Sequence, residues 1–72
     1  MKKIKKIEIK VNGKLKSIFD NLKISDLVKD LKIPLKKVAI ELNQEIIDKK
    51  NIGKISLKKD DKIEIVHFIG GG

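Results

Sequence analysis

The chain ends in three glycines, Gly70, Gly71 and Gly72, whose type and position suggest covalent chemistry at a carboxylate. Glycine lacks a Cβ atom and reaches backbone conformations closed to other residues, so such a segment can thread a narrow channel. We therefore expect residues 70–72 to form a flexible tail that presents the α-carboxylate of Gly72 to a partner. Because a carboxylate is a poor electrophile, the partner would first convert it with ATP into an acyl-adenylate, which a sulfur nucleophile could turn into a thiocarboxylate. The alternative is a terminal glycine run without a role, since chain ends are commonly disordered.

The predicted strand Lys62 to Ile69 leads directly into this tail. Its period of two places Ile63 and Ile65 on one face and Val66 and Phe68 on the other. Aromatic side chains are frequent anchors of interfaces, so we predict that Val66 and Phe68 form a docking surface for a partner. The alternative is that Phe68 folds back over a neighbouring side chain.

The single histidine, His67, shares its parity with Ile63 and Ile65, and we expect it to be partly buried near an edge of the sheet. No nucleophile or paired acid accompanies it, so we assign no catalytic residue. The sequence contains no cysteine, which excludes disulfides, thiolate metal sites and cysteine nucleophiles. A site built from several histidines is excluded too, and we expect no metal.

The first half of the chain predicts a hairpin and a helix. The strand Lys3 to Val11 alternates, Asn12-Gly13 is a strong two-residue turn signal, and Lys14 to Phe19 is the returning strand. Ser25 is the expected N-cap of a short helix. That helix should end near Ile33, because Pro34 disfavours helical geometry at the preceding residue.

The second half predicts short strands and turns. They are a strand from Lys37 to Leu42, a turn at Asn43-Gln44, a brief strand from Glu45 to Ile47, an exposed loop from Asp48 to Gly53, a turn or single helical turn at Ile55 to Leu57, and a charged turn from Lys58 to Asp61. The whole order is ββαββ. We predict an α+β, ubiquitin-like β-grasp with a mixed sheet and one crossing helix, residues 1–69 forming the domain and 70–72 the tail. This fold alone does not specify a function.

The sequence resembles the ThiS family of thiamine-biosynthesis sulfur carrier proteins over nearly its whole length. The segments that carry the resemblance are Val11–Gly13, Ser25–Val28, Val38–Ile47, Leu57–Val66 and the closing glycines. Two features depart from the family. Asp60 and Asp61 lack the glycine that often separates two acidic residues there, and the loop from Asp48 lacks a frequent aromatic residue, whose place Ile52 takes.

The resemblance implies that Gly72 is adenylated by an E1-like, ThiF-like adenylyltransferase that uses ATP with magnesium. A sulfur donor system would then supply the sulfur, and a ThiG-like thiazole synthase would receive it. The chain would be a protein co-substrate and not an enzyme, with no cofactor bound to itself. The alternatives are a sulfur carrier like the small subunit of molybdopterin synthase and a ubiquitin-like protein modifier.

The formal net charge of +8 comes entirely from lysine. Arginine is the better residue for bidentate contacts to phosphates and bases, and the sequence has no aromatic platform for stacking. We therefore do not expect a nucleic-acid partner, although a basic RNA-binding module is a weaker alternative. No apolar run approaches a membrane span or a signal-peptide core, so we expect no membrane partner and a cytoplasmic location.

Overall fold

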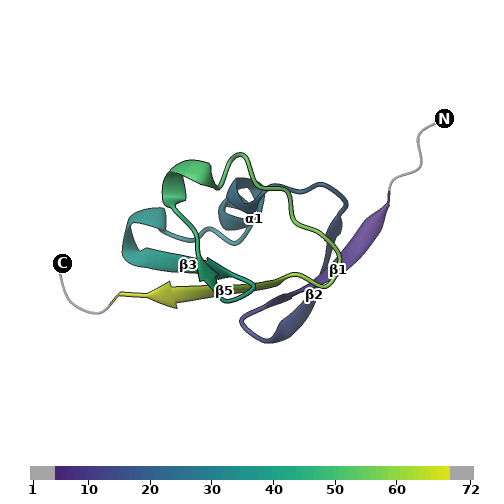
Figure 1. The fold of residues 1–72 in the computed structure, drawn as a ribbon, viewed down its shortest axis with the longest axis horizontal. Helices are drawn as coiled ribbons and strands as arrows, with labels where there is room; N and C mark the ends of the chain where they lie inside the picture. Colours follow the sequence, from purple (N-terminus) through teal and green to yellow (C-terminus); the bar gives the residue numbers. More distant parts are fainter. Residues whose placement is uncertain (1–4, 69–72) are drawn as a thin grey trace.

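The computed structural model describes residues 5–68, which form a mixed five-stranded β-sheet with one α-helix packed on one face (Figure 1). In sequence order the elements are β1 (Lys6–Val11), β2 (Lys14–Phe19), α1 (Ile24–Asp30), η1 (Leu35–Lys37), β3 (Val38–Leu42), β4 (Glu45–Ile46), η2 (Lys49–Asn51) and β5 (Lys62–His67), where η marks a 3-10 turn. The strands lie in the order β2-β1-β5-β3-β4. The predicted ββαββ arrangement is therefore confirmed.

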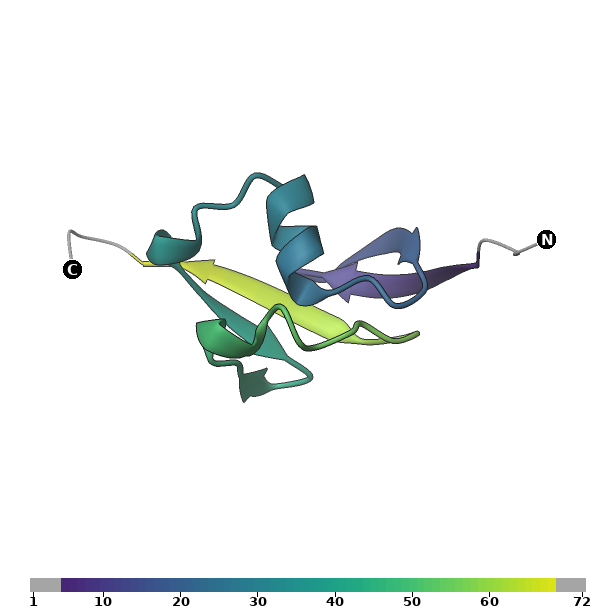
Figure 2. The ribbon, with the colours of Figure 1, turned by 90° about the horizontal axis from the view of Figure 1, so that it is seen from above.

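Strand β5 lies in the middle of the sheet, parallel to β1 and antiparallel to β3. It ends at the opposite end of the molecule from the start of β1, with α1 between these ends (Figures 1 and 2). The segment that leads into the glycine tail therefore belongs to a central strand, which β1 pairs at Lys62 and Ile63 and β3 pairs as far as His67. The predicted tail, residues 70–72, and the proposed domain boundary after residue 69 lie outside the described residues.

The β1–β2 hairpin forms at Asn12-Gly13, as predicted. Val11 pairs with Lys14, and the two turn residues have positive φ angles of 51° and 82°. Such angles define the turn whose twist matches that of the flanking strands, and asparagine and glycine reach them at low cost. The β3–β4 turn uses the same geometry without glycine, with φ angles of 51° at Asn43 and 73° at Gln44.

Helix α1 begins earlier than predicted. Its N-cap is Lys23, so the assignment of Ser25 as the cap is wrong, and Ser25 lies in the first turn. The carboxylate of Asp26 accepts a hydrogen bond from the Lys23 backbone N–H at 3.1 Å. Tertiary contacts set the start, because Ile24 is fully buried and its N–H donates to the Ile55 carbonyl at 3.0 Å.

The helix also ends earlier than predicted, at Asp30. Lys32 adopts a left-handed φ of 55°. Its N–H donates to the Lys29 carbonyl, and the Ile33 N–H donates to the Val28 carbonyl. This pair of bonds is a Schellman motif, which satisfies the last carbonyls of the helix. The helix therefore ends before Pro34 and not because of it.

The long connection from β4 to β5 differs from two expectations. The exposed loop after Asp48 instead contains η2 and the buried side chain of Ile52. The turn expected at Ile55 to Leu57 is absent from this described segment, where Ser56 forms a β-bridge with Lys23. The side chains of Ile52 and Leu57 are both buried in the core, and this burial anchors the connection at two points.

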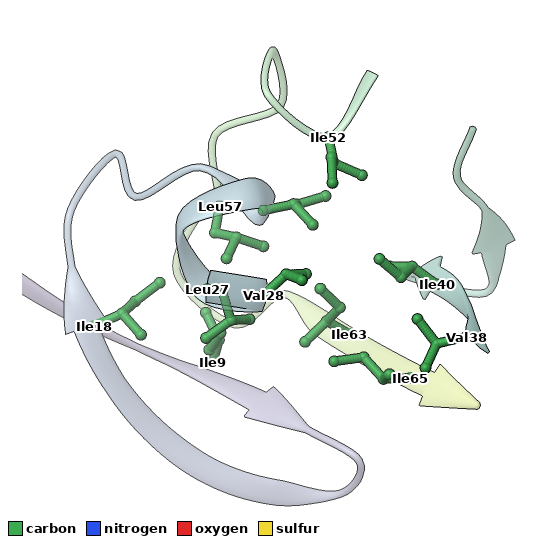
Figure 3. Packing of buried hydrophobic residues seen from close by; sticks show 11 residues of the cluster. Ile9, Ile18, Leu27, Val28, Val38, Ile40, Ile52, Leu57, Ile63 and Ile65 are labelled. Atoms are coloured by element: carbon green, nitrogen blue, oxygen red, sulfur yellow. The ribbon is translucent and has the colours of Figure 1, made fainter. Parts of the chain in front are cut away.

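The core lies between α1 and the sheet face that the helix covers (Figure 3). Its buried members are all aliphatic: Ile9, Ile18, Ile24, Leu27, Val28, Val38, Ile40, Ile52, Leu57, Ile63 and Ile65. β-branched residues dominate this set, in keeping with their fit to a pleated surface. Within residues 5–68 no helix has the length and apolarity that a membrane crossing requires.

Candidate functional site

The end of β5 is the last described part of the chain before the glycine tail. On one side it pairs with β3 in a register that joins Val38 to His67, and the Phe68 N–H then donates to the Lys37 carbonyl at 2.8 Å. The chain is therefore held against β3 up to Phe68. The position of Gly72 itself lies outside the described residues, as do those of Gly70 and Gly71.

Val66 alternates with buried Ile65 and lies on the face of the sheet opposite α1, and Phe68 follows the end of β5. Val66 is 50% exposed and Phe68 is 56% exposed, so the predicted outward orientation is confirmed. A docking role remains a prediction. Ile46, which was not predicted as part of this surface, is 77% exposed and lies opposite Glu41 on the same face of the sheet as Val66. The alternation within β3 and β4 would have revealed it.

The ring of Phe68 does not pack into the core. The ammonium nitrogen of Lys49, from η2, lies 5.4 Å from the centroid of the ring. A cation over an aromatic face is attracted by the ring quadrupole, but at an exposed site this attraction is only about 0.5–1 kcal/mol. A partner could displace Lys49 at small cost, so Val66 and Phe68 stay accessible next to the tail.

His67 is exposed, which corrects the expectation of a partly buried side chain near a sheet edge. It belongs to a central strand and points to the same face as buried Ile63 and Ile65. The β1–β5 pairing reaches only Ile63, so β1 provides no neighbour beside His67 and water reaches the ring. Among residues 5–68 no group of three His, Asp or Glu side chains is placed to hold a metal ion.

Two turn asparagines hold β5 from either side. The side-chain Oδ1 of Asn43 accepts from the Lys62 N–H at 2.9 Å, at the beginning of the strand. The side-chain Oδ1 of Asn12 accepts from the Ile65 N–H at 2.7 Å, near its end. The hairpin residues that were predicted for their turn conformation therefore also fix the strand that precedes the tail.

A hollow of about 470 Å³ lies at the other end of the molecule, beside the start of β1. It is lined by Lys5, Lys6, Ile7, Glu8, Asp20, Lys58 and Lys59. These side chains belong to the start of β1, the end of β2 and the turn before β5, away from the end of β5 (Figure 1).

The family model described as the ThiS family matches residues 9–72, which include the three terminal glycines. This chain belongs to the ThiS family. The sulfur carrier protein ThiS of Bacillus subtilis is 42% identical over 65 residues, which cover 89% of this chain and 98% of that protein. The crystal structure of the thiamine biosynthesis protein ThiS from Geobacter metallireducens has a TM-score of 0.81 at 29% identity, over 92% of this chain and all of that one. The ThiS fold, a ubiquitin-like β-grasp, is confirmed.

Thiazole synthases are also similar to this ThiS-family chain. The enzyme of Paramagnetospirillum magneticum is 33% identical over 66 residues, and that of Magnetococcus marinus is 35% identical over the same length. Each match covers 92% of this chain but only 20% of the enzyme. The chain thus spans about a fifth of the length of these relatives, which contain a ThiS-like segment within a longer protein.

Proposed function

We propose that this chain is a sulfur carrier protein of thiamine biosynthesis whose working group is the carboxylate of Gly72. The observation that carries the proposal is the family match over residues 9–72, which extends through the glycine tail. The relative named as a sulfur carrier protein matches over almost its full length, which supports the same activity for this chain.

The chemistry requires two steps at Gly72. A carboxylate oxygen attacks the α-phosphate of ATP and releases pyrophosphate, which leaves an acyl-adenylate. Sulfide from the sulfur donor system then attacks the acyl carbon, the bond to AMP breaks, and the tail ends in a thiocarboxylate. An E1-like, ThiF-like enzyme would supply the ATP site with its magnesium. The carrier binds no cofactor and acts as a co-substrate, not as an enzyme.

Thiazole synthase is the proposed recipient of the sulfur. In two relatives a ThiS-like segment is part of a chain named thiazole synthase. Joining two modules in one chain makes their encounter intramolecular and raises the effective concentration, which is useful for partners that must meet. For this chain, Val66 and Phe68 would provide the contact surface beside the tail.

The test is the intact mass of the chain after incubation with an E1-like adenylating enzyme, ATP, magnesium and a sulfide source. The expected result is the replacement of one oxygen by one sulfur, located at Gly72 by fragmentation. A chain lacking Gly71 and Gly72 is the control and should gain nothing while keeping its fold. Sulfur transfer by that shortened chain would contradict the proposal.

Two other results would support the alternative functions. Covalent adducts with protein lysines would indicate a ubiquitin-like protein modifier. Sulfur transfer to a molybdopterin precursor would indicate a sulfur carrier like the small subunit of molybdopterin synthase.

A further inference from the structure

The part of β5 that approaches the tail is poorly supported by β1. The parallel pairing of the two strands comprises Lys10 with Lys62 and Val11 with Ile63. The Asn12 N–H then donates to the Ile63 carbonyl at 2.9 Å, and the chain turns away into the β1–β2 hairpin. Beyond Ile63, the backbone of β1 makes no further pair with the described part of β5.

The side chain of Asn12 extends this pairing by one step. Its Oδ1 accepts from the Ile65 N–H at 2.7 Å, and its Nδ2 donates to the Ile65 carbonyl at 3.4 Å. A primary amide carries a donor and an acceptor like those of a peptide unit. The amide of Asn12 therefore substitutes for the strand residue that β1 lacks, and it binds β5 immediately before Val66.

Asn43 provides a close comparison. It is also the first residue of a two-residue hairpin turn, with the same φ of 51° as Asn12. Its side chain accepts from the Lys62 N–H at 2.9 Å and donates to the Asp61 carboxylate at 3.0 Å. Both asparagines thus bind the same strand, but Asn43 does so at its beginning and Asn12 near its exit.

We propose that Asn12 is a positioning residue for the end of β5, the strand that leads into the glycine tail, an inference that rests on the proposed function. By binding both backbone groups of Ile65, it fixes the end of β5, residues 66–68, from the side that β1 leaves unpaired. Residues 66–68 are paired only with β3 and with Lys37, which precedes it. Without the Asn12 side chain, Ile65 would also be paired with β3 alone, and the end of β5 would gain conformational freedom. A partner would then have to order this segment on docking, and this ordering costs free energy of association.

The variants that test this are Asn12→Gly and, as the matched control, Asn43→Gly. Glycine accepts positive φ and Gly-containing pairs form this turn, so both hairpins should persist while the side-chain bonds disappear. The first measurement is ¹⁵N relaxation, with amide hydrogen exchange at Ile65. Asn12→Gly should speed that exchange by about tenfold and lower the order parameters of Val66 and Phe68. Asn43→Gly should change neither.

The second measurement is ATP–pyrophosphate exchange by the E1-like enzyme, with the carrier as the varied substrate. In Asn12→Gly the half-saturating concentration should rise by roughly three- to tenfold with an unchanged maximal rate, because docking and not chemistry is affected. In Asn43→Gly it should stay within about twofold of the parent. Asn12→Asp retains an acceptor for the Ile65 N–H and should recover most of the loss.

Two results would overturn the inference. One is an unchanged order parameter at Val66 and Phe68 in Asn12→Gly. The other is an equal rise of the half-saturating concentration in both glycine variants, which would reflect a general loss of stability. If the parent chain itself is not adenylated, the proposed function fails. The relaxation measurement then still decides whether Asn12 positions the exit of β5.

Discussion

The ammonium nitrogen of Lys49 lies 5.4 Å from the ring centroid of Phe68, beside the exit of the tail. The same arrangement occurs at the other end of the molecule, where the ammonium nitrogen of Lys6 lies 5.4 Å from the ring centroid of Phe19. The two rings are similarly exposed, at 56% and 51%. Solvent exposure and the contact with lysine are therefore matched, and the two phenylalanines differ mainly in their distance along the molecule from the tail.

This match allows the docking role of Phe68 to be isolated. Phe68→Ala should raise the half-saturating concentration of the carrier in ATP–pyrophosphate exchange by about tenfold or more, as expected for an aromatic anchor of an interface. Phe19→Ala should leave it unchanged. Both variants should melt within a few degrees of the parent, because neither ring is buried. Equal kinetic effects of the two substitutions would argue against a docking surface at Phe68.

The aliphatic core makes a second prediction. Ile40 is fully buried on β3, opposite Ile65 of β5, whereas Ile46 is 77% exposed on the neighbouring strand. Ile40→Ala should lower the free energy of unfolding by about 2–5 kcal/mol, through lost burial and the cavity left behind. A domain of this length has only roughly 4–11 kcal/mol in total, so the variant will be marginal.

Ile46→Ala is the matched control for Ile40→Ala, since it removes the same atoms from a surface position. It should change the free energy of unfolding by no more than about 0.5 kcal/mol. Urea denaturation followed by circular dichroism measures both variants. Similar losses for the two would mean that the sheet face opposite α1 is covered in solution, contrary to the exposure of Ile46.

Much of the fold could be predicted because local signals and tertiary packing agree. Asn12-Gly13 and Asn43-Gln44 both form the expected turns, and the alternation in β5 correctly separates Ile65 from Val66. These patterns depend on neighbours in the sequence. The order ββαββ follows from them almost directly, as does the outward orientation of Phe68.

The errors occur where distant residues decide the local structure. Ser25 has the right chemistry for a helix cap, but the burial of Ile24 starts the helix earlier. His67 has the parity of a core residue, yet β1 ends too soon to cover it. The bonds from Asn12 to Ile65 span 53 positions of sequence, and no periodicity within either segment could have indicated them.

The adjacent residues Asp60 and Asp61, which lack the glycine frequent in the ThiS family, lead to the last prediction. Asp60 adopts a left-handed φ of 68°, the conformation for which glycine is suited. Asp61 is held by its side chain, which accepts from the Lys58 N–H at 2.8 Å and from the Asn43 amide at 3.0 Å. The same residue type is therefore used for two different purposes at neighbouring positions.

Substitutions that remove the same charge should accordingly act in opposite directions. Asp60→Gly relieves the left-handed strain and should raise the free energy of unfolding by up to about 1 kcal/mol, partly offset by the greater freedom of glycine in the unfolded chain. Asp61→Ala loses two hydrogen bonds and should lower it by about 1–2 kcal/mol. Urea denaturation at fixed ionic strength measures both, and a shift of the same sign in the two variants would show that net charge, and not turn geometry, governs this turn. The opposite signs would establish that Asp60 takes the conformational place of the missing glycine.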